Sequence, residues 1–299
     1  MKPDEYLKKI LEAQALDRDS TELKQMQQER EKIEEILKKQ FSGAKMTIRY
    51  GGSKAKNTMI KKSFDLDILV YFDSDDEVGG KNLKEIYDNV AKALAGSYSI
   101  QRKTSAIRLL KKDQTSVGEH FSIDIVPGRF TSDEKTDVFL HQENSARERL
   151  KTNPDKHIEH VRDSGVRDAI KLLKLWKIDH GLLNVKTFLL ELLIVKTLTA
   201  SKSKNLDEQL KTFWETMVED IDNIRIEDPA NPTGNDLSEL LTQIKSTLKR
   251  GSEQALAKVK NNQWDRIFGP VQVDEKNQQA AFAQILTSPS ERPQPWRRL

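Results

Sequence analysis

The run from Asp65 to Phe72, Asp-Leu-Asp-Ile-Leu-Val-Tyr-Phe, restricts the fold most, because it reads as a buried β-strand that starts with two acids. Residues i and i+2 of a strand project to the same face, so Asp65 and Asp67 should point together. A third acid, Asp124, interrupts the apolar run 121–126, where alternation places it on the face opposite the isoleucines. Three carboxylates on neighbouring strands provide the oxygen ligands of a two-metal site. We therefore predict a metal site at Asp65, Asp67 and Asp124.

A glycine-serine turn precedes the two acids. Gly52 and Ser53 follow the apolar run 46–50, and such a turn can place backbone N–H groups and a hydroxyl on phosphate oxygens. An Asp-x-Asp pair alone is more often a cap or a solvated strand edge. Its combination with this turn and with Asp124 favours a nucleotide site. A P-loop is excluded, because no glycine is followed at the required spacing by Gly-Lys-Ser/Thr.

The rest of the chain predicts an α+β fold. Short apolar runs between residues 46 and 126 indicate four or five strands of a mixed sheet, with a helix over 82–94 between the second and third strands. Helical periodicity covers residues 4–41. It returns in five later segments, separated by Gly181, the 228–235 loop and Gly251: 164–180, 187–200, 206–221, 236–249 and 252–267.

These patterns divide the chain into four parts. We expect N-terminal helices over 1–44 that pack on both lobes, and a catalytic sheet lobe over 45–152 that carries the metal site. An all-helical nucleotide-binding lobe follows over 153–287. The segment 288–299 holds three prolines and little apolar content, so we expect a flexible tail.

Composition narrows the possible functions. The 299 residues include 50 basic and 47 acidic side chains, a net charge of only +3, so any contact with nucleic acid should be local. There is no cysteine, which excludes a disulfide framework, a cysteine zinc site and a cysteine nucleophile. We found no apolar run of about 18 residues, so we expect a cytoplasmic protein without a membrane span.

The motifs resemble a known superfamily. Gly52-Ser53, Asp65-x-Asp67 and Asp124 are similar to the signature of the DNA polymerase β nucleotidyltransferases. Later segments resemble the helical lobe of oligoadenylate synthetases, archaeal CCA-adding enzymes and the bacterial cGAS-like (CD-NTase) enzymes. The resemblance spans roughly residues 45 to 269, and these later segments carry it: 172–177, 186–193, 228–235 and 264–269.

This resemblance implies a polymerase β-like fold and roles for individual residues. The three acids would bind two Mg²⁺ ions, for which Mn²⁺ can substitute, and Asp124 would also accept the proton of the attacking hydroxyl. Gly52, Ser53, Lys174 and Thr187 would hold the triphosphate.

Other assignments stay open at this point. Phe188 would either stack on the base or pack in the core, and Lys174 has a solvated helix face as its alternative. Asp228 and Asn235 are more consistent with bracing a loop than with touching the base. His157 and His160, one helical turn apart, are a weaker metal pair without a third ligand.

One departure from the family pattern is visible. Where relatives often read Lys/Arg-Gly-Thr after the turn, this chain has Lys56, Asn57 and Thr58. Asparagine tolerates positive φ better than most residues, so we expect the turn to be preserved.

The resemblance also implies an activity. Nucleoside triphosphates, ATP among them, would be joined into a cyclic di- or trinucleotide second messenger of bacterial antiphage (CBASS) signalling, with release of pyrophosphate. An activating protein or nucleic acid and a downstream effector would be partners. Three alternatives remain: a template-independent RNA nucleotidyltransferase of the tRNA CCA type, a linear oligoadenylate synthetase, and an inactive nucleotide-binding module.

Overall fold

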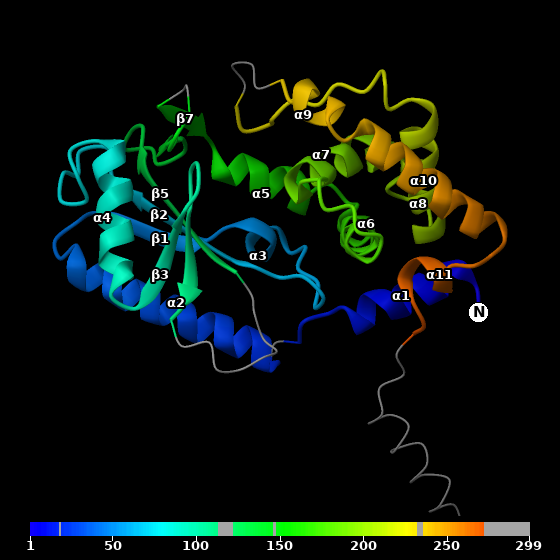
Figure 1. Cartoon of the computed structure of the whole chain (residues 1–299), viewed down its shortest axis with the longest axis horizontal. Helices are drawn as coiled ribbons and strands as arrows, with labels where there is room; N and C mark the ends of the chain where they lie inside the picture. The colour runs from blue at the N-terminus through cyan, green and yellow to red at the C-terminus, as the bar shows by residue number, and fades with distance from the viewer. Residues whose placement is uncertain (18, 113–121, 146–147, 232–235, 272–299) are drawn as a thin grey trace, which may run out of the picture.

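A sheet lobe and a helical lobe lie side by side in the computed structural model (Figure 1). The structure describes residues 1–271 except 18, 113–121, 146–147 and 232–235. The tail predicted at 288–299 and the predicted loop residue Asn235 therefore lie outside the described residues. A mixed sheet packed with helices confirms the predicted α+β class.

The sheet is larger than the sequence indicated. Its order is β1-β2-β5-β4-β3, with β6 pairing β5 and β7, and β2 and β5 run parallel while the other pairs are antiparallel. The expected four or five strands become seven in the described part of the chain. The strands are β1 (Met46–Tyr50), β2 (Leu66–Phe72), β3 (Tyr98–Arg102), β4 (Ile107–Lys111), β5 (Ile123–Phe130), β6 (Val138–His141) and β7 (Arg149–Thr152).

The strands that lie outside the predicted runs are β3, β6 and β7, and each is short. β3 and β7 are outer strands in which charged and polar side chains leave few apolar positions to mark a strand, and β6 has only four residues. β5 continues past the predicted end at Val126, because Pro127 and Gly128 still pair with β2 while β6 covers the far half of the strand.

Helices cover one face of this sheet. α2 (Thr21–Gln40) and α4 (Leu83–Ala95) share a core with the even-numbered residues of β2, Leu66 to Phe72. Asn82 begins α4, accepting a hydrogen bond from the Glu85 N–H at 2.9 Å. Since the even-numbered side chains face this core, the odd-numbered Asp67 projects from the opposite face.

The helical lobe is built around Trp176, Phe213 and Trp214, which are fully buried. Leu7 and Ile10 of α1 belong to this core, so α1 and α2 serve different lobes. Within the described residues, no helix is long and apolar enough to cross a membrane. The remaining helices are α1 (Pro3–Ala13), α3 (Gly52–Lys56), α5 (Pro154–Arg162), α6 (Arg167–Asp179), α7 (Thr187–Leu198), η1 (Thr199–Ser201), α8 (Leu206–Glu219), α9 (Ser238–Thr242), α10 (Lys245–Lys260) and α11 (Asp265–Phe268).

The break predicted at Gly251 was wrong. α10 runs through this residue without interruption, and the helix expected over 236–249 is divided instead between α9 and the start of α10. A Cβ at Gly251 would lie 3.1 Å from a ring carbon of Trp176. The glycine therefore allows α10 to approach the indole closely and does not mark a turn.

Candidate active site

The glycine-serine turn is pressed against the acids of β2. β1 pairs with β2 up to Tyr50, and the Gly51 N–H then donates to the Asp67 carbonyl at 2.9 Å. Gly52 has φ +50°, and a Cβ there would lie 1.7 Å from a carboxylate oxygen of Asp67. Asn57 ends α3 with φ 59°, so it takes the positive φ expected for this departure from the family pattern.

A prediction follows for Gly52→Ala. The new methyl group would force Asp67 aside, and a positive φ costs an L-residue about 1–2 kcal/mol. We expect a lower free energy of unfolding in urea and at least about a 100-fold loss of nucleotidyl transfer. Gly181→Ala is the matched control, because Gly181 has φ +64° but open space around its Cβ. Equal activity losses in the two variants would contradict the role of the Asp67 contact.

Asp65, Asp67 and Asp124 place three negative charges near one another. Asp67 and Asp124 are direct partners in the parallel β2–β5 pair, and Asp65 directly precedes β2. Burial raises the pKa of Asp67 to about 6, and the charges of Asp65 and Asp124 add to that rise. A carboxylate with this pKa is an unfavourable charge unless a cation joins it.

Asp124 is held by cations from the neighbouring strand. Arg108, its register partner on β4, donates from Nε and Nη2 to the two carboxylate oxygens at 2.9 Å, and Lys103 Nζ donates at 2.8 Å. Burial raises the pKa of Asp124, but these hydrogen bonds outweigh it and the net shift is downward. Among the described residues, no three acidic or histidine side chains converge as a ready metal site. Arg108 and Lys103 engage both carboxylate oxygens of Asp124 in this structure.

The two lobes enclose a cavity of about 200 Å³. It brings together nearly all the residues singled out in the sequence, although Asp124 is not part of its wall. Lys177 Nζ donates to the Thr187 hydroxyl at 3.1 Å, which fixes the hydroxyl at the cavity edge. The walls are formed by Gly52, Ser53, Lys56, Ser63, Asp65, Asp67, Lys174, Thr187, Phe188 and Glu191.

Three of these wall residues were missed in the sequence as site residues: Lys56, Ser63 and Glu191. Glu191 interrupts the apolar run of α7. That interruption was the available signal, because a buried acid in an apolar helix needs a partner. Lys174 is also buried and not on a solvated face, and its Nζ donates to the Thr58 carbonyl at 2.9 Å.

Phe188 lines this cavity and also an apolar hollow of about 220 Å³. The His157 ring packs edge-on against Phe188 at 5.0 Å, and His157 Nε2 lies 2.9 Å from an oxygen of Asp228. Asp228 also accepts from the Ala230 N–H at 2.9 Å, which fits the loop-bracing interpretation. His157 is thus engaged with Asp228 and Phe188. Burial lowers the pKa of His160.

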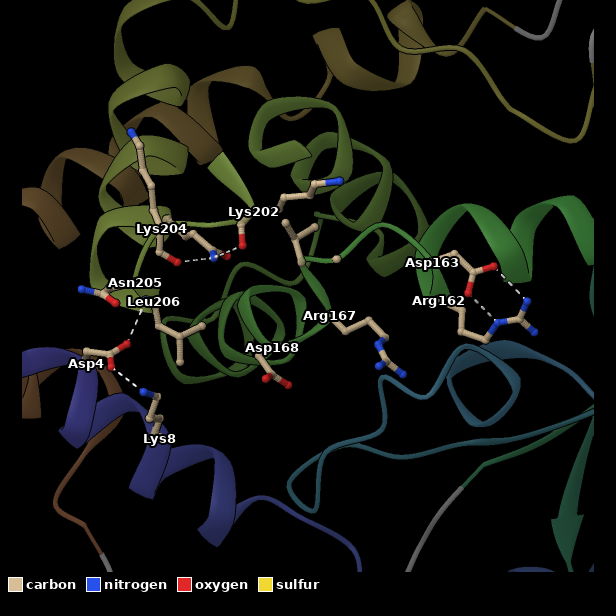
Figure 2. Close-up of a pocket in the computed structure, with 13 residues that line it drawn as sticks. Asp4, Lys8, Arg162, Asp163, Arg167, Asp168, Lys202, Lys204, Asn205 and Leu206 are labelled. Carbon is tan, nitrogen blue, oxygen red and sulfur yellow. Dashed lines mark hydrogen bonds and ion pairs between the residues drawn. The ribbon is translucent and has the colours of Figure 1, made fainter. Parts of the chain in front are cut away.

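A larger cavity of about 450 Å³ lies between α1, the turn before α6, and α8 (Figure 2). None of Asp65, Asp67 and Asp124 lines it. Lys8 is paired with Asp4 at 2.7 Å. Lys202, Lys204 and Arg167 point in different directions in Figure 2, so their charges do not meet at one point. Because catalysis needs convergent polar groups, the smaller cavity between the lobes is the better candidate active site.

A family model, the Second Messenger Oligonucleotide or Dinucleotide Synthetase domain, matches residues 1–164. No curated protein matches the chain.

Solved structures share the fold at low sequence identity. CdnC of E. coli MS115-1, in complex with HORMA-deltaN, is 17% identical with a TM-score of 0.63, over 90% of this chain and 97% of that one. CdnG of Bradyrhizobium diazoefficiens, in complex with GTP, is 13% identical with a TM-score of 0.64, over 94% and 98%. Vibrio cholerae DncV, a cyclic AMP-GMP synthase, is 17% identical with a TM-score of 0.60, over 91% and 86%.

Proposed function

Because the chain belongs to the Second Messenger Oligonucleotide or Dinucleotide Synthetase family, we propose that it joins nucleoside triphosphates into a cyclic di- or trinucleotide and releases pyrophosphate. Family membership makes the protein a nucleotidyltransferase. The observation that carries the proposal is the cavity between the lobes, where the glycine-serine turn, Asp65, Asp67 and Lys174 meet. ATP is the substrate we expect among the triphosphates.

The transfer step gives roles to five residues of the cavity wall and to Asp124. Gly52 and Ser53 hold the triphosphate from the sheet lobe, and Lys174 and Thr187 hold it from the helical lobe, with Phe188 against the base. A ribose hydroxyl oxygen forms a bond to the α-phosphorus, and the bond from that phosphorus to the bridging oxygen breaks, so pyrophosphate leaves with the electron pair. The hydroxyl proton passes to Asp124. Positioning by the two lobes supplies much of the rate enhancement.

The donor chemistry supports a magnesium site. We assign two Mg²⁺ ions, with Mn²⁺ as a substitute, to Asp65, Asp67 and Asp124. Burial raises the pKa of Asp67 most, and the charges of Asp65 and Asp124 raise it further against the opposing effect of Lys56 and Lys103. A divalent cation relieves this condition. When bound, such ions activate the attacking hydroxyl and neutralise charge on the triphosphate. Asp124 accepts the proton only after Arg108 and Lys103 leave, because both lower its pKa.

The biological setting extends the same proposal. We assign the product to antiphage signalling in the bacterial cytoplasm, where an effector protein binds it. CdnC of E. coli MS115-1, which shares this fold, was solved with HORMA-deltaN. A protein activator of comparable kind, or a nucleic acid, is therefore a partner to test.

The experiment is incubation with all four labelled triphosphates and Mg²⁺ or Mn²⁺, followed by phosphatase treatment and mass spectrometry. We expect a phosphatase-resistant product of two or three nucleotides, because a closed ring has no terminal phosphate. Linear products that lose their phosphates would indicate an oligoadenylate synthetase. Label that appears only in added tRNA would indicate an RNA nucleotidyltransferase and overturn the proposal.

A further inference from the structure

A buried charge network joins the lobes at one end of the candidate active site. Glu191 on α7 lies one turn after Thr187, on the same helix face, and is only 3% exposed. Its carboxylate accepts from Lys56 Nζ at 2.7 Å and from the Thr58 hydroxyl at 3.3 Å. Lys56 and Thr58 belong to the sheet lobe, so Glu191 links the two lobes through buried groups.

A second ammonium group shares this carboxylate. Lys174 Nζ lies 3.9 Å from Glu191 Oε1 and donates its hydrogen bond to the Thr58 carbonyl at 2.9 Å. Burial lowers the pKa of Lys174, the charge of Lys56 lowers it further, and Glu191 opposes both effects. Two buried like charges therefore lie beside one another because Glu191 lies between them.

We propose that Glu191 is a positioning residue that holds Lys56 and Lys174 for the triphosphate. All three side chains line the cavity that contains the glycine-serine turn, and Lys56 Nζ also lies 5.8 Å from the centre of the Phe188 ring. Lys56 thus becomes a triphosphate contact in addition to Lys174. The inference rests on the proposed function, because it concerns the same site and substrate.

A structural role alone accounts poorly for this network. Replacing a buried ion pair with apolar residues of similar size is often neutral or stabilising, so such a pair is weak evidence for a stability function. The lobes also have ion pairs outside the cavity, between Arg49 and Asp155 at 2.8 Å and between Lys62 and Asp179. Holding the lobes together therefore does not require two ammonium groups in the wall of the cavity.

The test is Glu191→Gln, which keeps the size of the side chain and removes its charge. We expect KM for the triphosphate to rise about 10-fold or more while kcat changes less, because the loss falls on groups that hold the bound substrate. Asp179→Asn is the matched control, since it makes the same chemical change at an ion pair between the lobes but outside the cavity, and its KM should stay within about twofold of wild type. An unchanged KM in Glu191→Gln would overturn the proposal.

A double variant keeps the test valid if Glu191→Gln folds poorly. Lys56→Met/Glu191→Leu replaces the 2.7 Å ion pair with apolar side chains of similar size. Lys174 keeps its hydrogen bond to the Thr58 carbonyl and can give up its proton, because burial lowers its pKa, so the variant should unfold at a temperature close to that of wild type. Its affinity for triphosphate analogues with a methylene bridge between the α- and β-phosphates, measured by calorimetry, should fall about 10-fold or more. Wild-type affinity would reject the role of Glu191. If the wild-type protein binds the analogues but forms no product, the proposed function is rejected. The affinities of wild type and the double variant for the analogues can still be compared in that case.

Discussion

Asp65→Asn should reduce product formation by roughly 1,000-fold while the protein keeps its fold. The amide has nearly the shape of the carboxylate but lacks the negative charge with which we propose that Asp65 binds the metal ions. Asp65 lies directly before β2 and lines the cavity beside Gly52 and Ser53. The measurement is pyrophosphate release at saturating triphosphate and Mg²⁺, together with far-UV circular dichroism and thermal unfolding.

Asp75→Asn is the matched control for this experiment. Asp75 is a solvent-exposed acid whose carboxylate pairs with Lys45 at 2.8 Å, so its removal should leave turnover at the wild-type level. Normal turnover in Asp65→Asn would reject the metal-site assignment. A loss of turnover in both variants would point to a general effect of charge. It would argue against a direct role of Asp65 in the reaction.

β2 and β5 were readable from sequence because each is an apolar run that an acid interrupts on one face. In β2 the even-numbered positions are apolar and buried while Asp65 and Asp67 take the other face, and this pattern fixed both the strand and the position of its acids. The same alternation identified Asp124 in β5. β3 and β7 also alternate, but each of these short outer strands has only two inward side chains among charged and polar ones, too few to mark a strand in the sequence.

The contacts within the site were harder to predict. Lys56 and Glu191 are separated by 135 positions and meet only because α3 and α7 face each other across the cavity. The pairing of Arg108 with Asp124 depends on the register of β4 against β5, which one sequence does not determine. Local periodicity therefore identified the elements that carry the chemistry, whereas the partners of the charged groups required the tertiary structure.

Asp67→Asn should stabilise the metal-free protein at pH 7.5 while abolishing nucleotidyl transfer. The pKa of Asp67 in the folded protein is about 6, above the usual 3.8, so the folded state binds this proton more tightly than the unfolded chain does. Its ionised form therefore lowers the free energy of unfolding above pH 6, by up to about 3 kcal/mol. Lowering the pH from 6 toward 4 restores that stability to the wild type.

Asparagine resembles the protonated carboxyl at every pH. The free energy of unfolding of Asp67→Asn should therefore exceed that of wild type at pH 7.5, and the difference should shrink as pH falls through 6 toward 4. Urea unfolding in EDTA at pH 7.5 and pH 4.5 measures this difference. Asp75→Asn should give no such gain at pH 7.5, because Lys45 lowers the pKa of Asp75 and its ionised form is favourable in the folded protein. Equal destabilisation of Asp67→Asn at both pH values would mean that the carboxylate stabilises the fold. A gain confined to pH 7.5, together with the loss of turnover, would show that the protein tolerates an unfavourable buried charge at the position where catalysis needs it.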